Sequence, residues 1–362
     1  MARALQLARQ GLNTTTPNPR VGCLLVRDGR VIGEGWHERA GEAHAEVNAL
    51  AYCKVDPAGS TCYVTLEPCC HHGRTPPCSQ ALIEAGVGRV IVAMQDPNPA
   101  VAGNGLAQLS AAGIATASGL LESQARQLNA GFCKRMQIGL PKVRSKIAAS
   151  LDGRTALANG DSRWITGEQA RADVHRLRAQ SCAIVTGIDT VLADDPRLTA
   201  RRHDADEARQ PMRVIMDSRL RLPPDAGLLQ QPGRTIVMAA ASADPTSREA
   251  LTQAGAEVVL LQGDDADTRL REALVVLACE HSVNEVMVEA GPALNGSLLR
   301  LGLMDELVVY MAPVLLGQEA KPMLNLSQLT DMAQRPVLAL SESRRVGDDL
   351  RLIYYPVASL DR

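Results

Sequence analysis

The feature that most constrains the fold of this chain is an alternation of strand-like and helix-like segments, interrupted once. Short apolar runs rich in Val, Ile and Leu alternate with segments whose apolar residues recur at helical spacing. Gly139-Leu140-Pro141 breaks this pattern, because Gly and Pro end regular structure. The 362 residues are also too many for one ordinary core. We therefore predict two α/β domains, residues 1–140 and 141–362, each with helices covering a central sheet.

The individual elements follow from the periodicity of the apolar residues. In the first domain, a hairpin around Asp28-Gly29 is expected from strands at 21–26 and 31–36, followed by strands at 61–66, 89–94 and 114–117 and helices at 43–53, 79–85, 105–112 and 122–137. In the second domain, strands are expected at 142–149, 183–186, 213–217, 235–240, 258–261, 286–289 and 307–311, and helices at 168–180, 248–254, 267–279 and 293–301. The charged segment 201–210 is expected to be a loop.

Composition excludes several classes of function. The net charge is −2 and only 2% of residues are aromatic, whereas nucleic-acid binders show basic faces or stacking aromatics. No run of eighteen apolar residues is present, so no membrane-spanning helix is expected. Nine cysteines, an odd number without a secretion signal, favour metal ligation by a subset over disulfides. We expect a cytoplasmic protein with a small-molecule substrate, no nucleic-acid partner and no membrane association.

Three short motifs in the first domain predict a zinc centre. His44-Ala-Glu46 is followed by Pro68-Cys69 and later by Cys78, and H-x-E with P-C and a further Cys is the signature of zinc deaminases. Neutral His44 and the thiolates of Cys69 and Cys78 would hold Zn²⁺ with three ligands and leave a fourth position for water. Zinc activates such a water as a nucleophile at neutral pH. Glu46 would move a proton from this water to the ring nitrogen and the leaving ammonia of an amino-heterocycle.

The alternative is a structural zinc site. Such a site normally has a fourth Cys or His ligand, and Cys70, His71 or His72 could supply it. The presence of Glu46 favours the catalytic interpretation, since a structural site has no use for a proton carrier. The remaining cysteines show no ligand spacing and are expected to be small buried apolar residues.

Eight residues separate Cys69 from Cys78, whereas two is the common deaminase spacing. His71, His72 and Arg74 in this insertion would suit a phosphate group. A solvated loop without a binding role explains them equally well, and the sequence leaves both interpretations open.

The second domain contains one segment favourable to phosphate binding. Residues 286–297 predict a strand, a glycine turn from Gly291 and a helix, an order that points backbone N–H groups at a phosphate. The segment is not G-x-G-x-x-G, so a plain β–α connection remains open. Ser150-Leu-Asp-Gly-Arg154 and Asp194-Asp195-Pro196 are equally compatible with ordinary turns or a helix cap.

Taken together, these motifs resemble the bifunctional riboflavin-biosynthesis deaminase–reductase family. The resemblance runs through essentially the whole chain and rests most specifically on the zinc loop with its eight-residue insertion. The matching segments are Thr16-Pro-Asn-Pro-Arg-Val-Gly22, His44-Ala-Glu46, Glu67-Pro-Cys-Cys-His-His-Gly-Arg-Thr-Pro-Pro-Cys78, Gln95-Asp-Pro-Asn-Pro99, Val101-Ala-Gly103, Ser150-Leu-Asp-Gly-Arg154, Trp164-Ile-Thr166, Val191-Leu-Ala-Asp-Asp-Pro196 and Val288-Glu-Ala-Gly-Pro292.

The resemblance implies a cytidine-deaminase-like three-layer domain followed by a dihydrofolate-reductase-like domain. It implies zinc-dependent deamination of 2,5-diamino-6-(5-phosphoribosylamino)pyrimidin-4-one, then NADPH-dependent reduction of the ribosyl chain to give 5-amino-6-(5-phosphoribitylamino)uracil. It also implies a homo-oligomer, a dimer or a tetramer, and a preference for NADPH over NADH.

The resemblance further assigns individual residues. The zinc ligands would be His44, Cys69 and Cys78, with Glu46 as the proton carrier. The NADPH contacts would be Ala148, Trp164, Thr190, Asp194, Ser218, Gly291, Pro292, Ala293, Leu294, Asn295, Gly296 and Ser297. The contacts with the reductase substrate would be Ser162, Arg178, Leu198, Arg201 and Glu289. Arg178 and Arg201 are expected to clamp the ribose phosphate.

Two rival hypotheses differ in class. A nucleoside, free-base or tRNA deaminase would need neither the second domain nor the long loop between the cysteines. A binding protein with an inactive deaminase fold would be expected to have lost Glu46 or a ligand, and all four are present.

Overall fold

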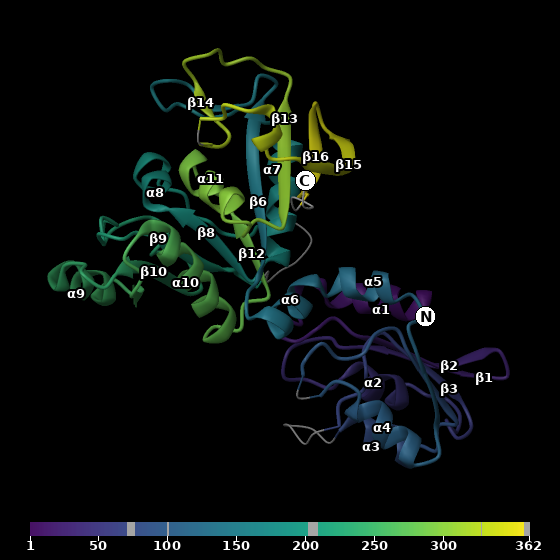
Figure 1. Ribbon diagram of the computed structural model, residues 1–362. Helices are drawn as coiled ribbons and strands as arrows, with labels where there is room; N and C mark the ends of the chain where they lie inside the picture. The colour runs from purple at the N-terminus through teal and green to yellow at the C-terminus, as the bar shows by residue number, and fades with distance from the viewer. Residues whose placement is uncertain (71–76, 100, 202–208, 327, 358–362) are drawn as a thin grey trace. The chain divides into compact units, whose positions relative to one another are not determined.

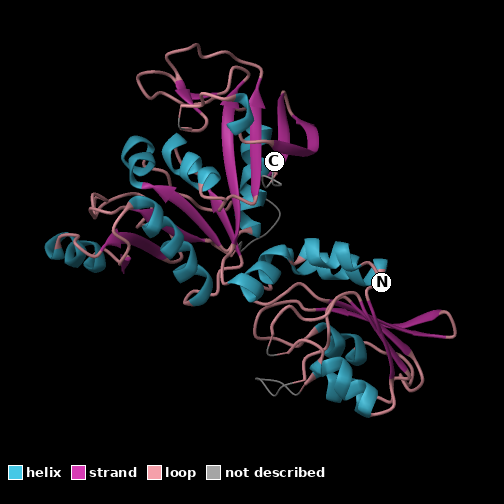
Figure 2. Cartoon of the chain, viewed as in Figure 1, coloured by secondary structure: helices cyan, strands magenta, loops and turns pink. Residues whose placement is uncertain are grey.

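The computed structural model describes residues 1–70, 77–99, 101–201, 209–326 and 328–357. The chain divides into two compact units, Met1–Leu140 and Pro141–Arg362. Within the described residues, no helix is both long enough and apolar enough to cross a membrane. Each unit contains its own sheet with helices packed against it (Figures 1 and 2).

The first unit contains a five-stranded sheet in the order β2-β1-β3-β4-β5. β1 is antiparallel to both of its neighbours, and β3, β4 and β5 are parallel. Its strands are β1 (Gly22–Arg27), β2 (Arg30–Trp36), β3 (Thr61–Val64), β4 (Arg89–Val92) and β5 (Ala115–Ser118); its helices are α1 (Ala2–Ala8), α2 (Ala45–Ala51), α3 (Cys78–Glu84), α4 (Asn104–Ala111), α5 (Glu122–Leu128) and α6 (Ala130–Ile138), with a short 3₁₀ helix at Arg9–Asn13.

Two glycines show how helices cover both faces of this sheet. A Cβ on Gly22 would lie 2.0 Å from the carbonyl oxygen of Ala4 in α1, and one on Gly35 would lie 2.4 Å from the backbone nitrogen of Ala49 in α2. Gly22 and Gly35 belong to adjacent pairs of the β1–β2 ladder, so they point to opposite faces. The unit is therefore a three-layer α/β/α arrangement, as the family resemblance predicts.

The predicted hairpin is confirmed, whereas the single helix predicted at 122–137 is wrong. The chain forms α5 and α6 instead, and the break lies at Asn129, with φ −112° and ψ 25°. The buried Asn129 amide accepts a hydrogen bond from the Arg20 backbone N–H at 2.8 Å and donates one to the Arg20 carbonyl at 2.9 Å. This tertiary pairing replaces the helical geometry that periodicity alone favours.

The second unit contains a nine-stranded sheet in the order β11-β10-β9-β8-β12-β6-β13-β16-β15. The strands from β11 to β13 are parallel, and the last two run antiparallel to their neighbours. The strands are β6 (Lys142–Ser150), β7 (Arg154–Ala156), β8 (Ala183–Gly187), β9 (Met212–Met216), β10 (Thr235–Ala240), β11 (Glu257–Leu261), β12 (Glu285–Val288), β13 (Glu306–Ala312), β14 (Lys321–Pro322), β15 (Leu338–Val346) and β16 (Asp349–Pro356); the α-helices are α7 (Glu168–Gln180), α8 (Ile188–Asp194), α9 (Pro245–Gln253), α10 (Ala266–Cys279) and α11 (Pro292–Arg300), and a 3₁₀ turn lies at Met332–Gln334.

Helix α7 packs on one face of the sheet at its centre. Val174 and Leu177 of α7 form a buried cluster with Met287, Val308 and Tyr310 of the neighbouring strands. The predicted elements up to β13 are present within one or two residues at most boundaries. Helix α8, the short β7–β14 pair and the C-terminal β15–β16 hairpin were not predicted from the sequence.

Candidate active sites

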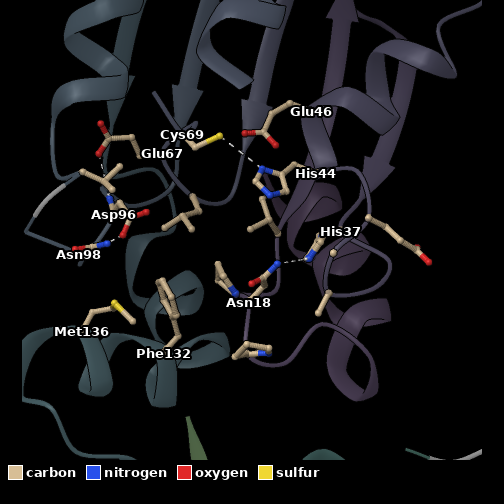
Figure 3. A pocket seen from close by; sticks show the side chains of 18 residues that line it. Asn18, His37, His44, Glu46, Glu67, Cys69, Asp96, Asn98, Phe132 and Met136 are labelled. Carbon is tan, nitrogen blue, oxygen red and sulfur yellow. Dashed lines mark hydrogen bonds between the residues drawn. The ribbon is translucent and has the colours of Figure 1, made fainter. Parts of the chain in front are cut away.

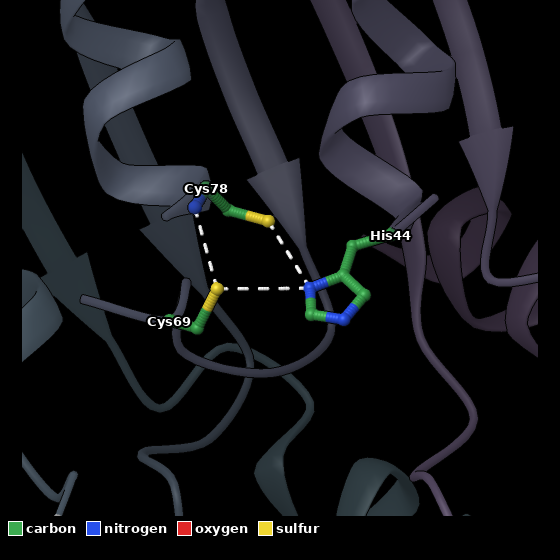
Figure 4. Close-up of side chains that lie close together, drawn as sticks. All are labelled: His44, Cys69 and Cys78. Carbon is green, nitrogen blue, oxygen red and sulfur yellow. Dashed lines mark hydrogen bonds between the residues drawn. The ribbon is translucent and has the colours of Figure 1, made fainter. Parts of the chain in front are cut away.

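The three predicted zinc ligands lie together at the ends of three elements. His44 is the N-cap of α2, Cys69 follows β3, and Cys78 is the first residue of α3. The His44 Nδ1 atom lies 3.6 Å from the Cys69 Sγ atom and 3.3 Å from the Cys78 Sγ atom (Figure 4). In a tetrahedral zinc site, Zn–S and Zn–N bonds of ordinary length place nitrogen and sulfur about 3.6 Å apart. The donor set and its spacing therefore fit a zinc ion.

Among the described residues, the cluster has three members, whose candidate ligand atoms all lie within 4.8 Å of one another. Cys70, one candidate for a fourth ligand, is described and does not belong to it. His71, His72 and Arg74 lie outside the described residues, so the predictions made for them stay predictions.

Hydrogen bonding favours the thiolate form of one of the two cysteines. Hydrogen bonds from the Cys78 thiol, from His44 and from the Cys78 backbone N–H lower the pKa of Cys69 to about 4. The backbone bond measures 3.3 Å. The same thiol contact and burial raise the pKa of Cys78. Because thiolates are the metal ligands, we expect zinc binding to release the Cys78 proton.

Glu46 lies one residue inside α2 and is 3% exposed. Figure 3 shows its carboxylate beside His44 and Cys69. Burial raises the pKa of Glu46 to about 7. A carboxyl group with a pKa near the working pH can both accept and donate a proton.

His44 and Cys69 of the zinc cluster line a cavity of about 660 Å³ in the first unit together with Glu46 (Figure 3). The sequence assigned no individual role to six polar residues that line it: Asn18, His37, Glu42, Glu67, Asp96 and Asn98. Asn18 and the pair Asp96 and Asn98 lie in the Pro-Asn-Pro and Asp-Pro-Asn-Pro segments that matched the family. These segments were the available signal, but they did not reveal which side chains face a ligand.

His37 shows how the wall of this cavity is fixed. The Asn18 Nδ2 group donates to His37 Nε2 at 3.0 Å, so the proton resides on His37 Nδ1, which donates to the Ala43 carbonyl at 3.0 Å. Burial lowers the pKa of His37, which keeps the ring neutral in this tautomer.

Glu67 organises the opposite wall. Its carboxylate accepts hydrogen bonds from the backbone N–H groups of Asp96 at 3.1 Å, Gly103 at 3.0 Å and Leu106 at 3.2 Å. It therefore caps the first turn of α4 and holds the loop that contains Asp96 and Asn98. We interpret Glu67 as a residue that positions this loop.

In the second unit, several predicted NADPH contacts gather at the carboxyl ends of parallel strands. Gly291 is the N-cap of α11 and lies three residues beyond the end of β12, and a Cβ on it would lie 4.0 Å from the Thr190 Oγ1 atom of α8. Ser218 follows β9, and Asp194 ends α8. In open α/β sheets, ligands bind at this edge. Ala148 lies on β6, and Trp164 is 72% exposed with the Arg171 guanidinium 4.5 Å from the centre of its ring.

Two residues of the glycine turn have local structural roles. Asn295 is fully buried, and its amide donates to the carbonyls of Ala290 at 2.8 Å and Gly291 at 3.3 Å. A Cβ on Gly296 would lie 2.0 Å from the Asn325 carbonyl oxygen. Asn295 therefore locks the turn and Gly296 admits the neighbouring backbone. Pro292, Ala293, Leu294 and Ser297 complete the first two turns of α11.

Glu289 is the centre of a buried ion cluster. Arg178 donates to its two carboxylate oxygens from Nε at 2.5 Å and Nη2 at 3.0 Å, and the Lys146 ammonium lies 3.1 Å away. Burial opposes ionisation, but Arg178 and Lys146 hold the pKa of Glu289 well below its usual range. Lys146 was missed by sequence reasoning, because only the pairing of β6 with β12 places it there.

Arg178 and Arg201, the two residues predicted to clamp the ribose phosphate, differ in how far the protein already engages them. Arg178 gives its remaining Nη1 group to the Thr199 carbonyl at 3.0 Å, so its three guanidinium nitrogens all donate within the protein. Arg201 is exposed and donates from Nη2 to His175 Nε2 at 3.1 Å. Burial, followed by Arg178 and Arg201, lowers the pKa of His175 to about 4, which keeps this acceptor neutral. Leu198 is 3% exposed and Ser162 is half-buried.

Comparison with known proteins identifies the family to which both units belong. A model of the RibD C-terminal domain matches residues 141–352, and one of the cytidine and deoxycytidylate deaminase zinc-binding region matches residues 1–94. The riboflavin biosynthesis protein RibD of Escherichia coli K12 is 50% identical, with 97% of each chain covered. The chain belongs to the RibD family. It is thus a bifunctional deaminase–reductase of riboflavin biosynthesis, with zinc and NADPH as cofactors.

Solved structures agree with this assignment over the whole chain. A RibD structure from Acinetobacter baumannii has a TM-score of 0.92 and 45% identity, covering 99% of this chain and 98% of its own. A diaminohydroxyphosphoribosylaminopyrimidine deaminase/5-amino-6-(5-phosphoribosylamino)uracil reductase from Thermotoga maritima has a TM-score of 0.86 and 32% identity, covering 99% and 97%. The predicted family, fold class and pair of activities are confirmed.

Proposed function

We propose that residues 1–140 deaminate 2,5-diamino-6-(5-phosphoribosylamino)pyrimidin-4-one and that residues 141–362 reduce the product to 5-amino-6-(5-phosphoribitylamino)uracil. The observation that supports the first step best is the three-ligand cluster, of which His44 and Cys69 line one cavity together with buried Glu46. The names of the Thermotoga maritima relative's activities support the choice of substrate.

In the deaminase site, His44, Cys69 and Cys78 would hold zinc and leave room for water. Zinc bound there supplies Lewis-acid activation of that water. Glu46 accepts the proton that the water loses as it adds to the amino-bearing ring carbon, and delivers it to the ring nitrogen. It then carries the second proton, from the hydroxyl group of the adduct, to the amino group, which leaves as ammonia while the carbonyl forms. The net reaction consumes one water and releases one ammonia. Asn18, His37, Asp96 and Asn98 supply the polar groups that orient the ring and the ribosyl chain.

In the reductase site, NADPH supplies a hydride to the ribosyl carbon when bound. The backbone of residues 291–297 at the start of α11 would face its phosphates, with Thr190 and Asp194 alongside and Ala148, Trp164 and Ser218 completing the contacts. Ser162, Arg178, Leu198, Arg201 and Glu289 would line the substrate site. There Arg178 fixes Glu289, and Arg201 meets the ribose phosphate.

We further propose a cytoplasmic homo-oligomer, a dimer or tetramer, that has no nucleic-acid partner. All nine cysteines are free thiols, as a reducing compartment requires. Leu315, Met332 and Leu340 are 71%, 73% and 56% exposed, apolar area that a second copy could cover. Light scattering on the purified protein would test the oligomer, and a monomer at micromolar concentration would overturn it.

A two-channel assay on the zinc-loaded protein tests the two reactions. Ammonia release and NADPH oxidation are followed in parallel with the diaminopyrimidine ribosyl phosphate as substrate. We expect ammonia without NADPH, and oxidation once NADPH is added. Ammonia without any oxidation would overturn the reductase assignment, and deamination of cytidine or of adenosine in tRNA in place of this substrate would overturn the first.

A further inference from the structure

The second unit contains a cavity of about 390 Å³ under α7 that neither proposed site uses. It lies between the later half of α7 and strands β6, β13, β15 and β16. Its charged lining residues are Arg144, Asp173, Arg176, Glu306, Arg344 and Arg351. None of these residues is among the proposed zinc, NADPH or substrate contacts.

The carboxylate of Asp173 is already fully engaged. Its side chain is 5% exposed and accepts hydrogen bonds from the Tyr310 hydroxyl at 2.8 Å, from Arg344 Nη2 at 2.9 Å and from Arg351 Nη1 at 3.0 Å. Arg176 lies 3.8 Å from the same carboxylate. Three guanidinium groups therefore surround one carboxylate, which can balance the charge of only one of them.

Of the other carboxylates described near the cavity, only Glu306 lines it, whereas Glu285 and Glu342 interact with its arginines from outside the lining. Glu306 is paired with Arg144 at 2.5 Å and with Lys142 at 2.6 Å. Glu342, which does not line the cavity, accepts from Arg351 Nη2 and lies 3.7 Å from Arg344. The lining itself has four arginines and two carboxylates, so an anion would offset the surplus.

The geometry of the surplus arginines suits a ligand that enters from solvent. Arg176 and Arg344 have side chains 70% and 46% exposed, whereas that of Arg351 is 11% exposed. The buried Nε atom of Arg351 has no hydrogen-bond acceptor among the described residues. Leu177, Val308 and Ile353 add an apolar wall.

We propose that this cavity binds the phosphate group of a small molecule. Guanidinium groups match phosphate oxygens in pairs, and Arg176 and Arg344 would contact the phosphate at the mouth with Arg351 behind them. Inorganic phosphate would fill only part of the cavity, and the apolar wall suits the organic portion of a phosphate monoester.

Calorimetric titration of the full-length zinc-loaded protein, saturated with NADP⁺, tests this proposal. The probes are inorganic phosphate and phenyl phosphate. Arg176→Gln removes only a long, exposed ion pair, so the protein should fold and keep both activities in phosphate-free buffer. We expect about tenfold weaker binding of the probe in Arg176→Gln and in Arg344→Gln, since each loses a charge-assisted contact.

Arg345→Gln is the matched control, because Arg345 follows Arg344 on the same strand, pairs with Asp348 and does not line the cavity. It should bind both probes like the unmodified protein. Binding of inorganic phosphate alone would identify free phosphate as the ligand, and tighter binding of phenyl phosphate would identify an ester. The proposal fails if neither probe binds, if Arg176→Gln and Arg344→Gln bind normally, or if binding is lost only in Arg201→Gln.

Discussion

Glu46 and Glu289 are both buried glutamates at the centre of a candidate site, yet their surroundings drive them in opposite directions. For Glu46 burial dominates and raises its pKa to about 7. For Glu289 the Arg178 and Lys146 cations outweigh burial and hold its pKa far below the ordinary range. Burial as the dominant influence thus makes Glu46 a proton carrier, and burial with two cations makes Glu289 a fixed negative charge. The first suits hydrolytic proton transfer, and the second suits a site where a cofactor supplies the reducing equivalent.

Disrupting the metal cluster should have the largest effect on activity. It should abolish the reaction of the first unit and leave that of the second unit intact. In Cys69→Ser, the thiolate that hydrogen bonds stabilise is replaced by a poor zinc ligand, so zinc content and deamination should both fall to background. NADPH oxidation with the already deaminated substrate should persist. Metal analysis and the two single-step assays measure this, and equal loss of both steps would contradict two separate sites.

Glu46→Gln should leave the metal in place and remove the proton carrier. We expect deamination to fall by about 10²–10⁴-fold, the usual contribution of general acid–base catalysis. The side chain keeps its size, so zinc content and the reductase step should match the unmodified protein. Normal ammonia release from this variant would show that another group moves the proton.

Glu289→Gln should lower stability, whereas Glu46→Gln removes a proton carrier. The substitution of Glu289 leaves Arg178 and Lys146 buried without their counter-charge. Such a loss costs about 3–5 kcal/mol of unfolding free energy. Glu306→Gln is a suitable control, since Glu306 is also a buried partner of an arginine and a lysine but is not a proposed substrate contact. Denaturant unfolding should show similar destabilisation in both variants. Only Glu289→Gln should raise the KM of the reductase step after correction for folded protein.

The stabilising effect of Glu289 should also depend on pH in a defined direction. Its folded-state pKa lies below the unfolded value of about 4.3, so its contribution is fully present above that value and is lost as the pH falls through the folded-state pKa. The difference in unfolding free energy between the unmodified protein and Glu289→Gln should therefore be largest near neutral pH and shrink below about pH 4. A difference that stays constant down to pH 3 would show that the cations do not hold the carboxylate ionised.

The zinc cluster and the hairpin could be predicted because each depends on local sequence. Asp28 and Gly29 have φ angles of 50° and 72°, the conformation that this residue pair favours in a two-residue hairpin turn. The spacing of His44, Glu46, Cys69 and Cys78 likewise reports the chemistry directly. The roles of Lys146, His37 and Glu67 depend on strand pairing and loop packing, which no local pattern reports. Strand β15 was missed because it forms an edge of the sheet, where exposed polar side chains obscure the strand pattern.

The smallest predicted effect is a loss of stability on substitution of Asn129, which lies in the same unit as Glu46. Its amide binds both the N–H and the carbonyl of Arg20 as a peptide group would, so Asn129→Ala removes two buried hydrogen bonds. We expect a loss of about 1–3 kcal/mol in unfolding free energy. Asn129→Asp keeps the acceptor and loses the donor, so it should retain part of the stability. Reductase activity should be unchanged in both variants, while thermal melting of the deaminase unit shifts downward. If Asn129→Ala were as stable as the unmodified protein, the hydrogen bonds between Asn129 and Arg20 would not be the cause of the break between α5 and α6.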